Sequence, residues 1–333
     1  MKTLMYLILM LSHFSIVSNQ SNNTNEILKE IEDFLYVKPS RSLLLLDKVK
    51  NSLSSEQMFH WHLLLVRAAV PTNQLDKLNK SIAVLIHEKN HPDFKENLPT
   101  ILSALGIWLR KKSYYYEADI SLKCALKYAN TKKQTMMLIN SRALVLWNSG
   151  NIKEAKALYI QVSKIAKEIN NINYQSVVNN NLGLIAIEAD ELTLAKQFFK
   201  KALDNYQAIA KRSGEVTAAG NLLFIFVLLD ELVNFQRLYP RIERMTAGYP
   251  NKSKKSFLFW TYIGFKAKNN EKITTEELDK LTKTFHQLGT YRVKATVIKH
   301  LSPLFGLSFA LEAQPKKVPF NQDWFKLVQS CQW

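Results

Sequence analysis

The fold is decided by the stretch Asn181-Leu182-Gly183-Leu184, with Ala195, Phe199 and Ala202 following it. Glycine and alanine allow two backbones to approach closely, so Gly183 and Ala195 predict a pair of tightly packed helices. Ala202 leaves room for the helix that comes next, and Phe199 fills the wedge between them. The stretch therefore predicts a hairpin of two helices that stacks on a further hairpin.

The same arrangement recurs three more times, once in a degenerate form. Each copy has two adjacent residues in a first helix and three packing residues in a second helix. The copies are Leu105-Gly106 with Ala118, Leu122 and Ala125; Arg142-Ala143 with Ala155, Tyr159 and Val162; and the degenerate Leu222-Leu223 with Phe235, Tyr239 and Ile242. The first packing residues of the four copies stand at positions 118, 155, 195 and 235, so the spacing is nearly constant. Self-similarity at a fixed period is typical of helical repeat proteins.

These residues resemble the tetratricopeptide repeat. That family places a Leu-Gly or similar small pair in helix A and an Ala, aromatic, Ala series in helix B, with a usual period of about 34 residues. The longer period of this chain implies longer helices, as in the extended repeats of some bacterial signalling proteins. The resemblance implies an all-α fold, a right-handed αα superhelix of about six helical hairpins.

We expect four segments along the chain. Residues 1–18 are a signal peptide, residues 19–98 hold degenerate N-terminal helical repeats, residues 99–250 form the core of the repeats, and residues 251–333 hold degenerate C-terminal repeats and a cap. Within the last segment, a short helix at 322–329 would cover the open end of the solenoid.

The N-terminus has the form of a secretory signal. Met1-Lys2 gives a positive start, an apolar stretch runs from Leu4 to Val17, and the sequence turns polar at Ser18. We expect cleavage after Ser18 and a periplasmic or secreted protein, with an uncleaved membrane anchor as the alternative. No later segment is long and apolar enough to predict a transmembrane helix in the mature chain.

Composition favours long helices and a partner of opposite charge. The 333 residues include only 9 Gly and 9 Pro, too few turn formers for a many-stranded β protein. The formal net charge of +17 favours acidic partners. Lysine spread over helix faces is also an ordinary way of staying soluble, so this alternative stays open.

The two cysteines, Cys124 and Cys331, are expected to be unpaired. In a solenoid that grows in one direction, residues several repeats apart lie far apart, at roughly 10 Å per helix layer. A disulfide needs Cα atoms within about 7 Å of each other. We therefore expect no intramolecular disulfide, and a buried Cys124 that packs as a small hydrophobic residue.

No motif predicts catalysis. The stretch His87-Glu88-Lys89-Asn90-His91 matches the H-E-x-x-H pattern of zinc proteases. Pro92 follows at once and pushes His91 out of the helical region, so the two histidines would not share a helix face. Glycine-rich phosphate loops and nucleophile motifs are absent from the sequence. We expect no catalytic residue, no metal site and no cofactor.

In the tetratricopeptide-repeat family, ligands usually lie on the inner, concave surface that the A helices line. The resemblance carries this surface onto nine residues here: Arg110, Lys111, Asn140, Leu144, Trp147, Asn148, Asn180, Leu184 and Glu188. Amides and a tryptophan suit an extended peptide, because amides bond to its backbone and an indole anchors a side chain. The alternative is that Asn140 and Asn180 bond to neighbouring helices and that Trp147 is core. The set does not reproduce the Lys/Asn carboxylate clamp of chaperone-binding relatives.

Three functions are compatible with these features. The first is a non-enzymatic exported scaffold that binds a protein or peptide partner in the cell envelope. The second is a periplasmic sensory or regulatory module that acts on a membrane signalling protein, because long-period repeats resemble the extracytoplasmic input regions of such receptors. The third is a polyanion-binding protein, suggested by the charge and by basic clusters such as Arg110-Lys111-Lys112. Nucleic acid is not favoured, because no base-reading motif accompanies the charge.

Overall fold

The computed structural model describes residues 24–35, 37–248, 251–311 and 319–333. This part of the chain consists of α-helices, two 3-10 helices and connecting turns, and it contains no strand. The protein is an all-α chain of helical-hairpin repeats, as the sequence predicts. The expected signal peptide lies outside the described residues. Within them, no helix has both the length and the apolar character that spanning a membrane requires.

The chain forms two compact units. Unit 1 comprises the residues up to Ala155 together with Pro319–Trp333, and unit 2 comprises Lys156–Val318. In the sequence, unit 2 is therefore an insertion between two parts of unit 1. The expected boundaries at residues 98 and 250 concern the regularity of the repeats and stay a prediction.

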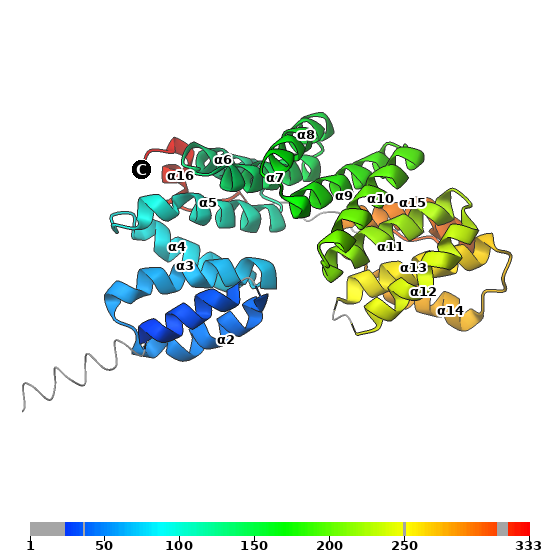
Figure 1. The fold of residues 1–333 in the computed structure, drawn as a ribbon, viewed down its shortest axis with the longest axis horizontal. Helices are drawn as coiled ribbons and strands as arrows, with labels where there is room; N and C mark the ends of the chain where they lie inside the picture. The colour runs from blue at the N-terminus through cyan, green and yellow to red at the C-terminus, as the bar shows by residue number, and fades with distance from the viewer. Residues whose placement is uncertain (1–23, 36, 249–250, 312–318) are drawn as a thin grey trace, which may run out of the picture. The chain divides into compact units, whose positions relative to one another are not determined.

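Unit 1 is a stack of antiparallel helices that follow one another in chain order. Residues 24–35 are helical. The next helices are α2 (Pro39–Val49), the 3-10 helix η1 (Lys50–Ser52), α3 (Ser55–Thr72), α4 (Leu75–His87), α5 (Phe94–Lys111), α6 (Tyr115–Lys127) and α7 (Lys132–Asn148), coloured blue to green in Figure 1. From α2 to α7, each α-helix packs against the next. The following helix, α8 (Ile152–Glu168), leads from unit 1 into unit 2.

Unit 2 continues the pattern with nearly uniform helices. Four of them have 17 residues each: α9 (Ile172–Glu188), α10 (Leu192–Ala208), α11 (Arg212–Leu228) and α13 (Lys252–Lys268). Between the last two lies α12 (Leu232–Ala247), with 16 residues. The remaining elements are α14 (Thr275–Phe285), α15 (Tyr291–His300) and the 3-10 helix η2 (Ser302–Phe305). The last two α-helices are shorter, with 11 residues in α14 and 10 in α15.

Left-handed turn residues mark the repeat period in the backbone. The turn between the two helices of each successive hairpin carries a residue with positive φ, at positions 73, 113, 150, 190, 230 and 270. The steps between these positions are nearly equal and agree with the spacing of the packing residues. A residue in this conformation ends a helix cleanly, and at Gly150 it is a glycine with φ of 90°.

Glycine in the repeat motif permits the close packing that the sequence predicts. A methyl group added to Gly183 would lie 2.6 Å from the ring of Phe199, and one added to Gly106 would lie 2.6 Å from Leu122 Cγ. Phe199 and Leu122 are both fully buried. In these two hairpins, a glycine of the first helix therefore makes room for a bulky side chain of the second helix.

After α14, the chain of unit 2 turns back over helices that it has already formed. We call residues 291–309 the return segment; its helix α15 is orange in Figure 1. Arg292 Nη1 donates to Glu188 Oε1 at 2.5 Å, and Lys299 Nζ donates to Asp190 Oδ2 at 2.6 Å. These contacts join residues 104 and 109 positions apart. The return segment thus packs against the end of α9.

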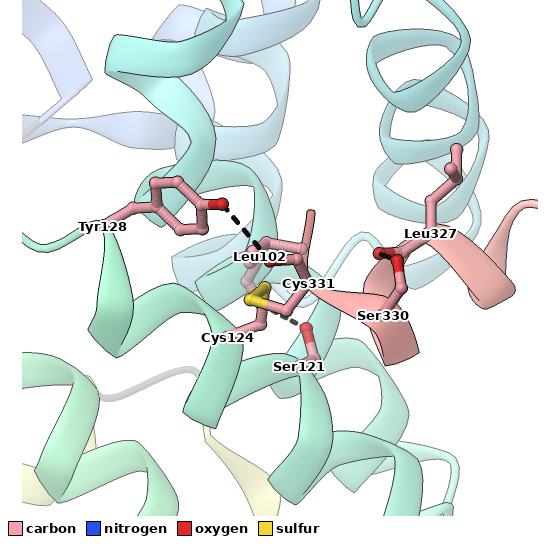
Figure 2. Close-up of a disulfide and its surroundings, with 7 residues drawn as sticks. All are labelled: Leu102, Ser121, Cys124, Tyr128, Leu327, Ser330 and Cys331. Carbon is pink, nitrogen blue, oxygen red and sulfur yellow. Dashed lines mark hydrogen bonds between the residues drawn. A yellow bond between two sulfur atoms is a disulfide. The ribbon is translucent and has the colours of Figure 1, made fainter. Parts of the chain in front are cut away.

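The two cysteines form a disulfide, so the expectation that they stay unpaired is wrong. Cys124 of α6 and Cys331 are bonded, with Cα atoms 5.5 Å apart (Figure 2). The expectation assumed that the chain keeps growing in one direction. Instead, Pro319–Trp333 returns to unit 1, where α16 (Phe325–Ser330) packs on α6. Cys124 itself is buried, as predicted.

The C-terminal segment, residues 319–333, runs along α6 from one end to the other. At the start of α6, the rings of Phe320 and Tyr114 have centroids 5.2 Å apart. At its end, the Tyr128 hydroxyl donates to the Cys331 carbonyl at 3.3 Å (Figure 2). A short C-terminal helix is present as α16, but it packs on α6 and is therefore not the cap of the open end that the sequence predicts. Its buried Phe325 joins the hydrophobic core of unit 1.

Candidate functional site

The predicted inner-face positions recur once per repeat from α7 to α13. Three of the predicted residues in α7 are each separated from a predicted residue in α9 by the same number of positions in the sequence. The same spacing leads on to residues in α11 and α13. Three rows result: Asn140, Asn180, Gly220 and Trp260; Leu144, Leu184, Phe224 and Gly264; and Asn148, Glu188, Leu228 and Lys268. We call these the inner-face positions. The name follows the face on which the family resemblance places them. Those of α7 belong to unit 1 and the others to unit 2.

In unit 2, the chain itself engages the three predicted residues of α9. Asn180 is buried, and its Oδ1 accepts a hydrogen bond from Asn221 Nδ2 of α11 at 3.0 Å. This is the bond to a neighbouring helix that the sequence left open as the alternative. Leu184 packs against the hydrophobic core, and Glu188 forms an ion pair with Arg292 of the return segment. All three side chains therefore contact the protein's own residues.

In unit 1, Asn140 is the predicted residue with an unsatisfied hydrogen-bond acceptor. Its Oδ1 is buried and has no hydrogen-bond partner among the described residues. Leu144 and Asn148 are half-buried one and two turns further along the same helix. Trp147 is buried at 7% exposure, which suits packing better than presentation to a ligand. A buried oxygen that accepts no hydrogen bond costs about 1–3 kcal/mol of stability. A partner that donates a hydrogen bond to this oxygen would recover part of that free energy.

The cations at the end of α5 are explained by contacts within unit 1. Lys111 Nζ donates to Asn73 Oδ1 in the turn after α3. Burial, and then the neighbouring Arg110 guanidinium, lower the pKa of Lys111 from its ordinary value. Both side chains stand in the last turn of α5, where helix carbonyls favour positive charge. Lys111 therefore ties two successive hairpins together.

The histidine motif lies at a helix end, as its sequence predicts. Helix α4 ends at His87, and His91 lies beyond it with its ring stacked on Phe59, the centroids 4.0 Å apart. The two histidines are therefore not presented on one helix face. His62 is hydrogen-bonded to Ser81 at 3.0 Å, and burial lowers its pKa to about 4. Among the residues that the structure describes, no cluster of His, Cys, Asp and Glu could hold a metal ion.

Sequence reasoning missed the residues that close the inner face of unit 2. Phe224, Trp260 and Gly264 occupy inner-face positions, and each contacts the return segment. The repeat step from Asn180 and Leu184 would have found these three. The return segment itself carried no comparable signal, because its local sequence does not say which distant helices it packs against.

Comparison with known proteins agrees with the repeat pattern. Residues 134–208 match the family model of the tetratricopeptide repeat. These residues, which span α7 to α10, are therefore similar to tetratricopeptide repeats. No curated protein sequence matches the chain.

Several solved structures are similar to the chain in outline. BtubC from P. vanneervenii is 15% identical, with a TM-score of 0.49, and the match covers 75% of this chain and 98% of that one. The apo form of RapI is 12% identical, with a TM-score of 0.46 and coverage of 82% and 86%. A Rap protein complexed with competence and sporulation factor is 12% identical, with a TM-score of 0.48 and coverage of 86% and 92%. With TM-scores below 0.5, these likenesses say nothing about the function of this chain.

Proposed function

We propose that the protein is a non-enzymatic, exported scaffold that binds an extended peptide segment of a partner protein on the inner face of unit 1. The repeat fold supports a binding role, because stacked hairpins present a long surface rather than a catalytic pocket. The observation that carries the proposal is the buried Oδ1 of Asn140, which no described residue satisfies. A backbone N–H of an extended peptide is a donor of the right kind.

The spacing along α7 also suits an extended peptide. Asn140, Leu144 and Asn148 follow one another at four-residue intervals, so they lie on one helix face. Four residues of helix rise about 6 Å, and alternate residues of an extended chain lie about 6.6 Å apart. A peptide that runs along α7 would place alternate residues against an amide, an apolar side chain and a second amide.

Export is part of the same proposal. Support comes from the apolar stretch between Leu4 and Val17 and from the Cys124–Cys331 disulfide. Disulfides persist in the periplasm and outside the cell and are rare in the cytosol. Fractionation of the tagged full-length protein, with mass determination of the mature form, tests this part. Recovery in the cytoplasm with the N-terminus intact would contradict it.

The peptide site is tested with matched substitutions at equivalent positions. A displayed library of short linear peptides first supplies a bound peptide as the probe. We expect Asn140→Leu to weaken binding of this probe roughly tenfold, while thermal stability stays equal or rises, because a desolvated carbonyl is removed. Asn180→Leu should instead destabilise unit 2, because it leaves the Asn221 amide unpaired. Unchanged binding by Asn140→Leu, or a library that yields no binder, would contradict the proposal.

A further inference from the structure

The inner face of unit 2 is covered by the protein's own return segment. The first part of this cover is electrostatic. Arg292 and Lys299 of α15 pair with Glu188 and Asp190, at the last residue of α9 and in the turn after it. Glu188 is an inner-face position, so α15 approaches α9 from the side where a ligand of the repeat would lie. Two cations of the return segment thus pair with two carboxylates at the end of α9.

The second part of the cover is apolar and lies further along the segment. The His300 ring contacts Phe224, with centroids 6.0 Å apart. A methyl group added to Gly264 would lie 2.9 Å from Leu301 Cδ2. Phe224 and Gly264 are consecutive inner-face positions on α11 and α13, so the segment crosses the face from one helix to the next. The absence of a side chain at Gly264 makes the room in which Leu301 seats.

An aromatic group completes the cover. Phe305 and Phe309 contact Trp260, with ring centroids 6.0 Å and 5.7 Å away. Phe309 also stacks on Phe285 of α14 at 4.0 Å. Trp260, a third inner-face position, is fully buried. The return segment therefore occupies inner-face positions on α9, α11 and α13 in turn.

The fit of the return segment leaves two polar groups unsatisfied. Trp260 Nε1 and Ser302 Oγ are both buried and have no hydrogen-bond partner among the described residues. Desolvated donors without an acceptor disfavour the packed arrangement. Two aliphatic side chains of the return segment, Val297 and Leu301, are fully buried in the hydrophobic core of unit 2, whereas the Arg292 and Lys299 ion pairs remain partly exposed. The return segment thus contacts unit 2 as a bound peptide contacts a groove, through a few buried anchors and flanking ion pairs.

We propose that the return segment is an intramolecular ligand, which occupies a peptide-binding groove on unit 2 until a partner segment replaces it. The chemistry of the groove defines the partner: a peptide with cationic side chains for Glu188 and Asp190, followed by aliphatic and aromatic side chains for Phe224, Gly264 and Trp260. A partner that also brings a carbonyl to Trp260 Nε1 satisfies a group that the return segment does not. This proposal concerns unit 2 and does not depend on the peptide site of unit 1.

The test uses a labelled synthetic peptide of residues 291–309 as the probe and the mature, disulfide-bonded protein as the receptor. Arg292→Glu with Lys299→Glu places like charges against Glu188 and Asp190, and we expect this repulsion to favour release of the segment. We expect this double variant to bind the probe roughly tenfold more tightly than the natural protein, because the competent fraction rises. Arg41→Glu with Lys77→Glu is the matched control, since it breaks two partly exposed ion pairs in unit 1. It should leave probe binding unchanged.

Equal binding by the folded double variant and the natural protein would overturn the proposal. If the double variant does not fold, amide hydrogen exchange in the natural protein decides the question. If the amides of residues 291–305 exchange faster than those of α13, the segment opens locally, and this result supports a displaceable segment. Exchange as slow as in α13 would show that the segment is part of the core, and would overturn the proposal.

Discussion

At the residue scale, two buried glycines in first helices of the hairpins differ in the space around them. Gly183 in α9 faces the Phe199 ring, and a methyl group there would lie 2.6 Å from it. Gly220 in α11 is also buried, but a methyl group there would have no atom within 4 Å. The glycine at 183 is therefore required by packing, whereas the one at 220 only lowers helix propensity.

We expect the same substitution to have opposite effects at these two positions. Gly183→Ala should lower the free energy of unfolding of unit 2 by about 1–3 kcal/mol, because a buried ring must shift. Gly220→Ala should raise it by about 1 kcal/mol through helix propensity. Denaturant unfolding of the two variants measures both values. A destabilising effect at 220 equal to that at 183 would contradict this account.

The sequence predicts the packing residues better than the binding residues. Gly183, Phe199 and Ala202 follow from close packing, which a spacing rule captures. The fate of a polar inner-face residue depends on its neighbours in space: Asn180 is satisfied by Asn221, and Asn140 Oδ1 is not. No periodicity distinguishes these two asparagines, because they occupy the same position of successive repeats.

At the scale of elements, α14 is fastened at its first turn. Thr274 and Glu277 form a capping box, in which each side chain accepts a hydrogen bond from the other residue's backbone N–H. Glu277 also accepts two bonds from Lys266 Nζ of α13, at 2.8 and 2.9 Å. These bonds, first that from Lys266 and then that from the Thr274 backbone, lower the pKa of Glu277.

This ion pair predicts a pH dependence of stability. A carboxyl group whose pKa is lower in the folded state stabilises the fold above its ordinary pKa, and this stabilisation is lost as the pH falls through the folded value. We expect Glu277→Gln, which can keep the cap, to be less stable than the natural protein at neutral pH, with a difference that shrinks below about pH 4. Thermal melts across pH measure it. Glu276→Gln, at an exposed neighbour, is the control, and an equal effect there would contradict the role of Lys266.

The sequence predicts that the helices of the repeats form, but it does not predict which distant helices the later segments pack against. The helices of the repeats follow from their period and from helix-ending turn residues such as Gly150. Helix α15 lies in the stretch where the sequence predicts degenerate helical repeats, but nothing in that stretch predicts its return to α9. Its ion pairs span more than a hundred residues, and only the completed three-dimensional path of α13 and α14 determines where the segment lands.

At the scale of the whole molecule, one covalent bond joins the two parts of unit 1. The cysteines are 207 positions apart, and all of unit 2 lies between them in the sequence. Closing a loop of this length removes conformational entropy from the unfolded chain that corresponds to about 5 kcal/mol in the chain-entropy model. The sequence could not reveal the pairing, because it gives no sign that the C-terminal segment returns to α6.

We expect removal of this bond to affect unit 1 selectively. Cys331→Ser, or reduction of the natural protein, should lower the unfolding temperature of unit 1 and speed hydrogen exchange in residues 319–333. The exchange of α9–α13 in unit 2 should stay unchanged and serves as the internal control. Two free thiols in the unfolded, unreduced protein would contradict the disulfide directly.

The bond also determines what a protease can accomplish. A single cut at any peptide bond between Cys124 and Cys331 leaves two polypeptides that remain one covalent particle. A nick in unit 2 therefore cannot release a fragment, and it shows only on a denaturing gel run with reductant. Outside the cell, where proteases are common and thiols scarce, the protein would persist as a two-chain form after such a cut, with its C-terminal segment still attached to α6.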